Sequence, residues 1–243
     1  MERTHIISLI ISVMSFTAGF AQTVTSSILS KQRIGELFPE SVCSSLDIHF
    51  PIVQVDHYTD KSGSYYCVLT ESRDETFEDE AFGGLDTLNR KIMAVNIKEE
   101  ENGALTKRWE INDFITKNKY ADEDELSIWF WKGYTAFNDL DGDGLVDPLL
   151  VYGTRENFNY TGNGRVKIII YHKGKKIAIR HQNGILDGQR ETRVDPSFYE
   201  LPQKMQAAVK QRMTGMEENR HTIFPLYWEK QMEHKKTYLA DNY

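Results

Sequence analysis

The chain has 243 residues with 29 basic and 36 acidic side chains, which gives a formal net charge of −7 at pH 7. This balance excludes a protein that binds nucleic acid or anionic lipid non-specifically, because both depend on lysine and arginine. A length of 243 residues with 40% hydrophobic residues accommodates one domain with a substantial core.

The first 21 residues have the pattern of a signal peptide. A short polar start containing Arg3 precedes an uncharged run over residues 6–20, and Gly19 and Ala21 place small residues at positions −3 and −1 of a cleavage site. The run is shorter than the roughly 18 residues of a spanning helix. We therefore predict cleavage after Ala21 and a single globular domain over residues 22–243, periplasmic or secreted and not membrane-spanning. The alternative is an uncleaved anchor.

The chain has two cysteines, Cys43 and Cys67. An even number of cysteines in an oxidising compartment is compatible with a disulfide bond between them. Two buried free thiols are the alternative, and the sequence leaves both open.

Short β-type segments separated by turn residues follow in chain order and predict about eight strands. Their connections are short, so the strands are expected to be mostly antiparallel. The segment 71–89 is acidic and irregular, which predicts a mobile surface loop, with simple disorder as the alternative. The expected strands cover residues 49–58, 64–71, 91–98, 105–111, 126–137, 145–152, 165–172 and 175–181.

Several of these strands are apolar on both faces, so helices must cover the sheets. The candidates are a short N-terminal helix over residues 28–38 and a C-terminal helix over 201–218, with Pro202 in its first turn and an apolar stripe that includes Met205 and Val209. The predicted fold class is therefore α+β and β-rich, with both helices packed on antiparallel sheets.

An acidic loop over residues 139–147 is the most specific motif of the sequence. Carboxylates occupy positions 1, 3, 5 and 9, Gly144 permits a sharp turn at position 6, and a backbone carbonyl at position 7 can add an oxygen. Hard oxygen ligands in this number favour calcium, whereas an acidic surface turn is the alternative. The predicted metal ligands are Asp139, Asp141, Asp143, Leu145 and Asp147.

The loop differs from an EF-hand, since Leu150 stands where the bidentate glutamate would be and a strand follows. It resembles the calcium hairpins of FG-GAP and VCBS-type repeats, in which F-x-D-x-x-x-D-G-x-x-D leads into an apolar strand ending in glycine. Those repeats build β-propellers from many copies. With one copy in this chain, a full propeller is not expected.

Two further regions are candidates for ligand binding. Residues 178–193 are rich in side chains that recognise sugars or phosphates, although a solvated strand end is the alternative. The aromatic run from Trp129 to Tyr134 could stack on a glycan, although such runs more often belong to a core. The candidate ligand-binding residues are Arg180, His181, Gln182, Asn183, Asp187, Arg190, Trp129 and Trp131.

Catalytic patterns are weak. Asp187 with His181, or Glu71 with Asp74, could form acid–base pairs, but the sequence contains no nucleophile elbow, zinc-protease, P-loop or Rossmann motif. We therefore assign no catalytic residue.

Several motifs between Cys67 and Trp228 together resemble a small family of exported bacterial surface polysaccharide biosynthesis proteins. The resemblance implies a link to cell-surface glycan and identifies no reaction. We accordingly favour a non-enzymatic envelope protein that is stabilised by calcium and assists or binds polysaccharide. The alternatives are a glycan-active hydrolase or transferase and an envelope protein–protein module. The motifs are Ser127-Ile-Trp-Phe-Trp131, residues 138–148, Val151-Tyr-Gly-Thr154, residues 179–187, Phe198-Tyr-x-Leu-Pro202 and Ile223-Phe-Pro225.

Overall fold

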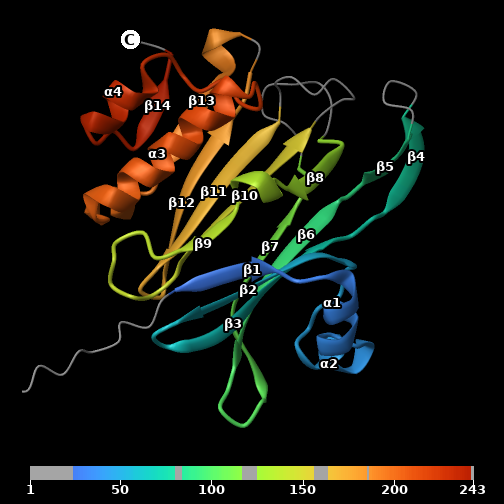
Figure 1. Ribbon diagram of the computed structural model, residues 1–243. Coiled ribbons are helices and arrows are strands. Elements are labelled where there is room, and N and C mark those ends of the chain that lie inside the picture. Colours follow the sequence, from blue (N-terminus) through green and yellow to red (C-terminus); the bar gives the residue numbers. More distant parts are fainter. Residues whose placement is uncertain (1–23, 80–83, 117–124, 156–163, 185, 242–243) are drawn as a thin grey trace, which may run out of the picture.

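The computed structural model describes residues 24–79, 84–116, 125–155, 164–184 and 186–241 (Figure 1). The predicted signal peptide, residues 1–21, lies outside them. Two antiparallel β-sheets form the body of the structure, and helices lie on their outer faces. Within the described ranges, every helix is too short or too polar to cross a membrane.

The first sheet has the strand order β1-β2-β3-β6-β7. Tight turns join its longest strands. The β2–β3 turn places Asp60 opposite Gly63, and Gly63 has a φ of +134° that favours glycine. The strands are β1 (Thr25–Ile28), β2 (Ile52–Asp60), β3 (Gly63–Glu71), β6 (Lys91–Glu99) and β7 (Leu105–Phe114).

The second sheet has the order β14-β13-β12-β11-β10-β8, and β9 pairs with β10 beside this path. The β11–β12 hairpin turns at Lys173 and Gly174, which have φ values of +48° and +76°. Positive φ at both central residues is the geometry of a two-residue hairpin turn. The strands are β8 (Ser127–Phe130), β9 (Ala136–Asn138), β10 (Asp147–Arg155), β11 (Arg165–His172), β12 (Lys175–Gln182), β13 (Glu191–Val194) and β14 (Tyr238–Ala240).

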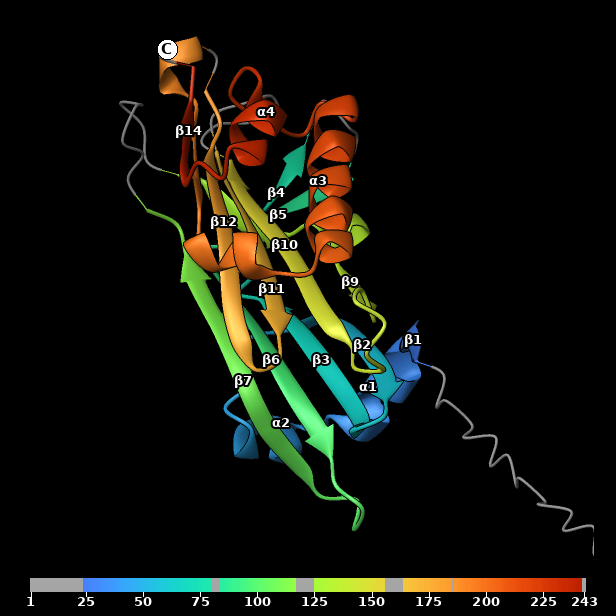
Figure 2. The same cartoon turned by 90° about the vertical axis from the view of Figure 1, so that its left-hand side faces the viewer.

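Three buried layers follow from the alternation of side chains along the strands. In β3, Cys67 and Leu69 face the second sheet, whereas Val68 faces the outer helices. Both faces of each sheet are therefore apolar, as the uninterrupted apolar strands predicted. The result is a helix–sheet–sheet–helix sandwich, and Figure 2 shows helices on both outer sides of the paired sheets.

The helices cover the outer faces as predicted. α1 and α2 lie on the first sheet, and α3 and α4 on the second. Four apolar side chains of α3, from Met205 to Met216, are fully buried, and burying each contributes about 2 kcal/mol. Pro202 is the N-cap, so α3 begins just after the proline that was expected in its first turn. The helices are α1 (Lys31–Leu37), α2 (Glu40–Ser45), α3 (Gln203–Glu218) and α4 (Trp228–Glu233), and the 3₁₀ turns are η1 (Lys132–Tyr134), η2 (Asp187–Gln189) and η3 (Pro196–Glu200).

Two local expectations were wrong. The segment 71–89, expected as a loop, contains a two-stranded hairpin of β4 (Glu75–Asp79) and β5 (Gly84–Leu88) that extends from the body (Figure 1). Its strands are polar and so lack the apolar alternation that would have revealed them. The strand expected over 126–137 is divided into β8 and β9 by η1, because the chain turns at Lys132-Gly-Tyr134.

Candidate functional site

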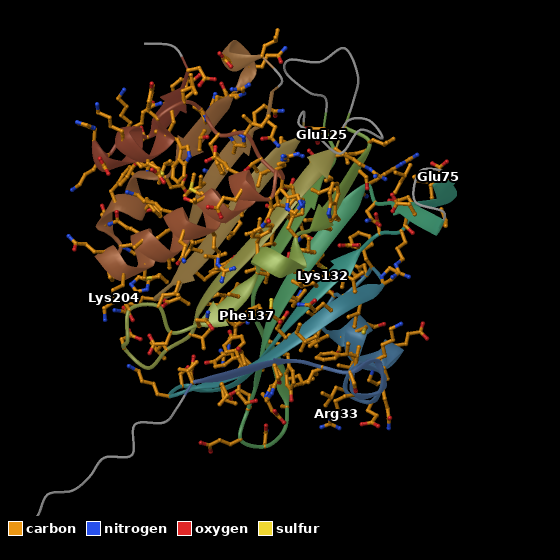
Figure 3. All side chains as sticks on the ribbon, turned by 45° about the horizontal axis from the view of Figure 1, so that its top comes forward. Arg33, Glu75, Glu125, Lys132, Phe137 and Lys204 are labelled. Atoms are coloured by element: carbon orange, nitrogen blue, oxygen red, sulfur yellow. The ribbon has the colours of Figure 1, made fainter. Side chains whose placement is uncertain are left out.

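The acidic loop connects β9 to β10 at the end of the second sheet. Asn138 pairs with Asp147 where the loop closes. Gly142 and Gly144 have φ values of +86° and +82°, a backbone region that side chains disfavour. Phe137, labelled in Figure 3, lies just before the loop. Its ring stacks on Tyr58 of the first sheet, with ring centroids 5.3 Å apart. The loop is thus held at the junction of the two sheets.

The side chain of Asp139 accepts three of the hydrogen bonds that organise the loop. Its Oδ1 accepts hydrogen bonds from the backbone N–H groups of Gly142, at 2.7 Å, and Asp143, at 3.1 Å. Its Oδ2 accepts a third, from Gly144 at 2.8 Å. These three hydrogen bonds from the backbone to one side chain fix the curl of the loop.

Three carboxylates converge inside this curl. Asp139, Asp141 and Asp147 each offer an oxygen, and these oxygens lie within 4.8 Å of one another. Asp147 is 4% exposed, and burial raises the pKa of its carboxyl even though His172 and the N–H of Leu140 lie beside it. A cluster of this kind can hold a metal ion, because each oxygen has lone pairs beyond those used by the N–H groups.

Asp143 lies outside this group of three. Its Oδ1 accepts from the N–H of Leu145 at 2.9 Å, and its Oδ2 is 3.2 Å from Nζ of Lys173. The N–H of Leu145 and the Lys173 ammonium hold the pKa of Asp143 below its usual value. Of the four predicted carboxylate ligands, the structure therefore brings three together and pairs the fourth with a lysine.

Two turns hold the loop from outside, and neither was anticipated from the sequence. From the β2–β3 turn, Asp60 Oδ2 accepts from the N–H of Val146 at 3.0 Å, and the N–H of Lys61 donates to the carbonyl of Gly144 at 3.1 Å. From the β11–β12 hairpin, His172 Nδ1 lies 2.8 Å from Asp147 Oδ1. The hairpins were predicted, but nothing local to them indicates that they meet residues 139–147.

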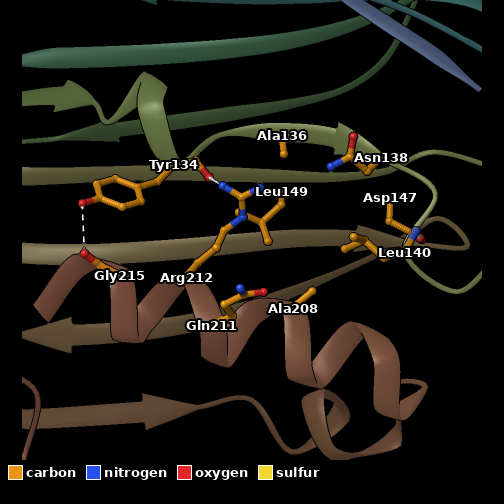
Figure 4. Close-up of a pocket in the computed structure, with 10 residues that line it drawn as sticks. All are labelled: Tyr134, Ala136, Asn138, Leu140, Asp147, Leu149, Ala208, Gln211, Arg212 and Gly215. Carbon is orange, nitrogen blue, oxygen red and sulfur yellow. Dashed lines mark hydrogen bonds between the residues drawn. The ribbon is translucent and has the colours of Figure 1, made fainter. Parts of the chain in front are cut away.

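A pocket of about 450 Å³ adjoins the loop between α3 and the β9–β10 edge of the second sheet (Figure 4). Asp147 and Leu140 form one end, and Arg212 reaches into it from α3. Arg212 is half-buried. Its aliphatic stem can cover apolar surface while the guanidinium remains in the pocket.

The described polar residues of 180–190 point to different faces and have different partners. His181 is 3% exposed, with its Nδ1 2.8 Å from Thr192 and its Nε2 2.7 Å from Asn183, and burial lowers the pKa of His181 to about 4. Asn183 is buried with it. Arg180 points to the other face of β12 and pairs with Asp195 at 2.5 Å. His181 is therefore a hydrogen-bonded core residue in its neutral form.

The other candidate ligand-binding residues of segment 180–190 are Gln182, Asp187 and Arg190. Gln182 donates to the carbonyl of Asn183 at 3.2 Å. Asp187 is exposed in η2 and pairs with Arg190 at 2.9 Å. The acid–base pair suggested for Asp187 and His181 does not form, since one side chain is exposed and ion-paired and the other is buried among different partners.

Glu71 and Asp74 have separate structural partners. Glu71 accepts from the N–H of Phe130 at 3.1 Å, and burial raises the pKa of this glutamate. Asp74 accepts from the N–H of Arg90 at 2.6 Å. Each carboxylate therefore connects two chain segments: Glu71 binds the backbone at Phe130, and Asp74 binds the backbone at Arg90.

Trp129 and Trp131 are half-buried at the edge of the second sheet, with ring centroids 6.3 Å apart. The Trp131 ring lies against Gly153, where an added Cβ would be only 2.7 Å from it. Trp131 also contacts His221, at 5.8 Å between centroids. The Trp131 ring therefore packs between Gly153 and His221.

Both cysteines are free thiols. Cys67 lies in the layer between the sheets, whereas Cys43 belongs to α2 and packs on the opposite face of the first sheet. The disulfide alternative is therefore incorrect, because the sheet separates the two sulfur atoms.

Comparison of the chain with protein families, with curated proteins and with solved structures finds no match.

Proposed function

We propose that this protein is an exported calcium-binding envelope protein in which an ion in the acidic loop stabilises the junction of the two sheets. The observation that carries this proposal is the convergence of Asp139, Asp141 and Asp147 within 4.8 Å. We further propose that the protein assists or binds cell-surface polysaccharide without catalysing a reaction. That part is supported by the signal-peptide pattern and by the family resemblance of residues 67–228.

Electrostatics supports a bound cation. Two carboxylates about 4 Å apart repel by roughly 4 kcal/mol at an effective dielectric constant of 20. Lys173 offsets part of this repulsion, but its ammonium is exposed and lies 3.4 Å from Asp141 and 3.2 Å from Asp143. A divalent ion among Asp139, Asp141 and Asp147 would offset the rest.

The donor set favours calcium over other divalent ions. Carboxylate oxygens are hard ligands, and calcium accepts six to eight oxygens in flexible arrangements, including backbone carbonyls and water. Asp143 and the Leu145 carbonyl are the ligands that the sequence adds to the three converging carboxylates. Calcium would supply positive charge to the loop and no reaction step.

The position of the loop determines what the ion would do. Val146 and Gly144 are hydrogen-bonded to the β2–β3 turn of the first sheet, and Asp147 begins β10 of the second. An ion that holds the curl of the loop would also hold these contacts. Its effect is therefore expected to be on the free energy of unfolding of the whole sandwich.

Thermal unfolding with calcium and with a chelator tests the calcium proposal. A ligand that binds only the folded state at 100 times its Kd stabilises that state by about 2.7 kcal/mol, so Tm should rise clearly with calcium and less with magnesium. Asp141→Asn should remove the response and the exposed Asp187→Asn should keep it. An unchanged Tm in the wild type would refute the site, and a response lost only in Asp143→Asn would show that other ligands hold the ion.

Polysaccharide association is tested separately. The mature protein, immobilised through its C-terminus, should retain purified cell-surface polysaccharide from the organism that produces it. Retention of an envelope protein in place of glycan would replace this part of the proposal and leave the calcium part unaffected.

A further inference from the structure

The pocket beside the acidic loop contains an arginine with no acidic partner. Arg212 is half-buried, and its Nη1 donates to the carbonyl of Tyr134 at 2.8 Å (Figure 4). Among the described residues, no carboxylate lies within 4.0 Å of its guanidinium. Burial lowers the pKa of Arg212, but an arginine remains protonated at neutral pH. The pocket therefore contains a fixed positive charge.

The other arginines that are at least half-buried differ in this respect. Arg155 pairs with Asp86 at 2.7 Å, Arg165 with Glu125 at 2.5 Å, and Arg190 with Asp187 at 2.9 Å. Removing a guanidinium from water without a negative partner costs free energy. Within the described part of the chain, Arg212 is the exception, so no described acidic side chain neutralises its charge.

The guanidinium also has unused donors. It has five N–H donors in a planar fork, and the described contacts use one of them, at Tyr134. A carboxylate matches such a fork with two parallel hydrogen bonds. Asp147, at the opposite end of the pocket, is one of the proposed calcium ligands, so its carboxylate is already engaged there. A carboxylate ligand would therefore orient toward Arg212.

The remaining walls are suited to a small ligand with hydroxyl groups. The side-chain amides of Asn138 and Gln211 line the pocket, and amides both donate to and accept from hydroxyls. Ala136 and Ala208 keep the space open between them. A volume of about 450 Å³ lies within the range of pockets that hold small molecules.

We propose that this pocket binds a small polyhydroxylated carboxylate of the uronic acid class, with its carboxylate on Arg212 and its hydroxyls on Asn138 and Gln211. The choice of a sugar rests on the proposed association with polysaccharide. The choice of a carboxylate rests on Arg212 alone.

Calorimetric titration of the mature protein in calcium tests this inference. D-Glucuronate should bind about tenfold or more tightly than D-glucose, which lacks the carboxylate, and than acetate, which lacks the hydroxyls. Equal binding of glucose would overturn the role of Arg212. Equal binding of acetate would overturn the sugar class.

Two variants locate the ligand. Arg212→Gln should weaken glucuronate binding about tenfold or more, whereas Lys204→Gln removes one charge from the exposed start of the same helix and should leave binding unchanged. Ala208→Leu keeps the guanidinium but fills the pocket, and it should also abolish binding. Wild-type affinity in Arg212→Gln, or in a folded Ala208→Leu, would refute the site.

The same variants separate this inference from the proposed function. The Tm of Arg212→Gln should still rise with calcium, because Arg212 is not among the converging carboxylates. If polysaccharide is retained by the wild type while glucuronate does not bind, the pocket assignment fails and the proposed function stands.

Discussion

The acidic loop and the segment 180–190 are both rich in polar side chains, yet their geometry differs. In the loop, Asp139 collects three backbone N–H groups within five residues, so neighbours in sequence become neighbours in space. In β12, successive side chains point to opposite faces, so Arg180 faces one layer and His181 another. Local spacing therefore predicts a site in a curled loop and does not predict one along a strand.

The largest expected effect is that of Asp139→Ala. The change removes a carboxylate that accepts three backbone hydrogen bonds, and bonds to charged groups contribute about 1.5–3 kcal/mol each. We expect the free energy of unfolding in calcium to fall by about 3 kcal/mol or more, and the Tm response to calcium to disappear. Denaturant unfolding with and without chelator measures both. A loss below about 1 kcal/mol would mean that Asp139 does not organise the loop.

His181→Ala should have the next largest effect. It leaves Thr192 and Asn183 without their histidine partner and creates a cavity, which together cost about 2–3 kcal/mol. Polysaccharide binding should be unchanged, because His181 is buried. Impaired glycan retention by a folded His181→Ala would restore this residue as a binding candidate.

The pH dependence of His181 gives a related prediction. Burial lowers the pKa of His181 from 6.5 to about 4, so only the unfolded chain takes up a proton at this residue between those values. Its contribution to stability is complete above pH 6.5 and is lost as the pH falls toward 4. From pH 7 to pH 5 the loss is about 2 kcal/mol. His181→Gln should have a shallower pH profile, and identical slopes would contradict the buried neutral state.

Lys173→Ala should have a smaller effect on the loop. Its exposed ammonium lies near the carboxylates of Asp141 and Asp143, and so competes with a metal ion for these negative charges. We expect calcium to bind a few-fold more tightly, and the Tm difference between calcium and chelator to widen. Lys175→Ala, in an exposed position nearby, is the matched control. Weaker calcium binding in Lys173→Ala would show that the lysine assists the site.

The smallest effects are expected from Arg180→Ala and Asp187→Ala. Arg180 and Asp187 are largely exposed, and ion pairs of exposed side chains contribute about 0–1 kcal/mol. Arg190, the partner of Asp187, also lies 3.9 Å from Asp241, which remains when Asp187 is removed. Each variant should unfold within about 0.5 kcal/mol of the wild type. A larger loss for either one would mean that segment 180–190 is more tightly organised than its contacts indicate.

The sequence by itself determined the secondary structure of the body and the curl of the acidic loop. These features depend on contacts between residues that are close in sequence, so the spacing of residue types reveals them. They are the apolar strands flanked by turns, the apolar stripe of α3 and the Asp and Gly spacing of residues 139–147. The sequence does not predict the hairpin of β4 and β5, because apolar and polar residues do not alternate along these strands. It does not predict the turn at η1 either, because this turn lies within a largely aromatic run.

Only the tertiary structure decided which distant groups meet. Segments far apart in the chain meet at the acidic loop: Asp60 bonds to Val146, and His172 and Lys173 approach the loop from another hairpin. The position of Arg212 beside the loop likewise depends on where α3 packs. The separation of Cys43 from Cys67 by a sheet is of the same kind. Such contacts result from the packing of two sheets and a helix, and no local pattern of residue types encodes which turn will lie against which loop.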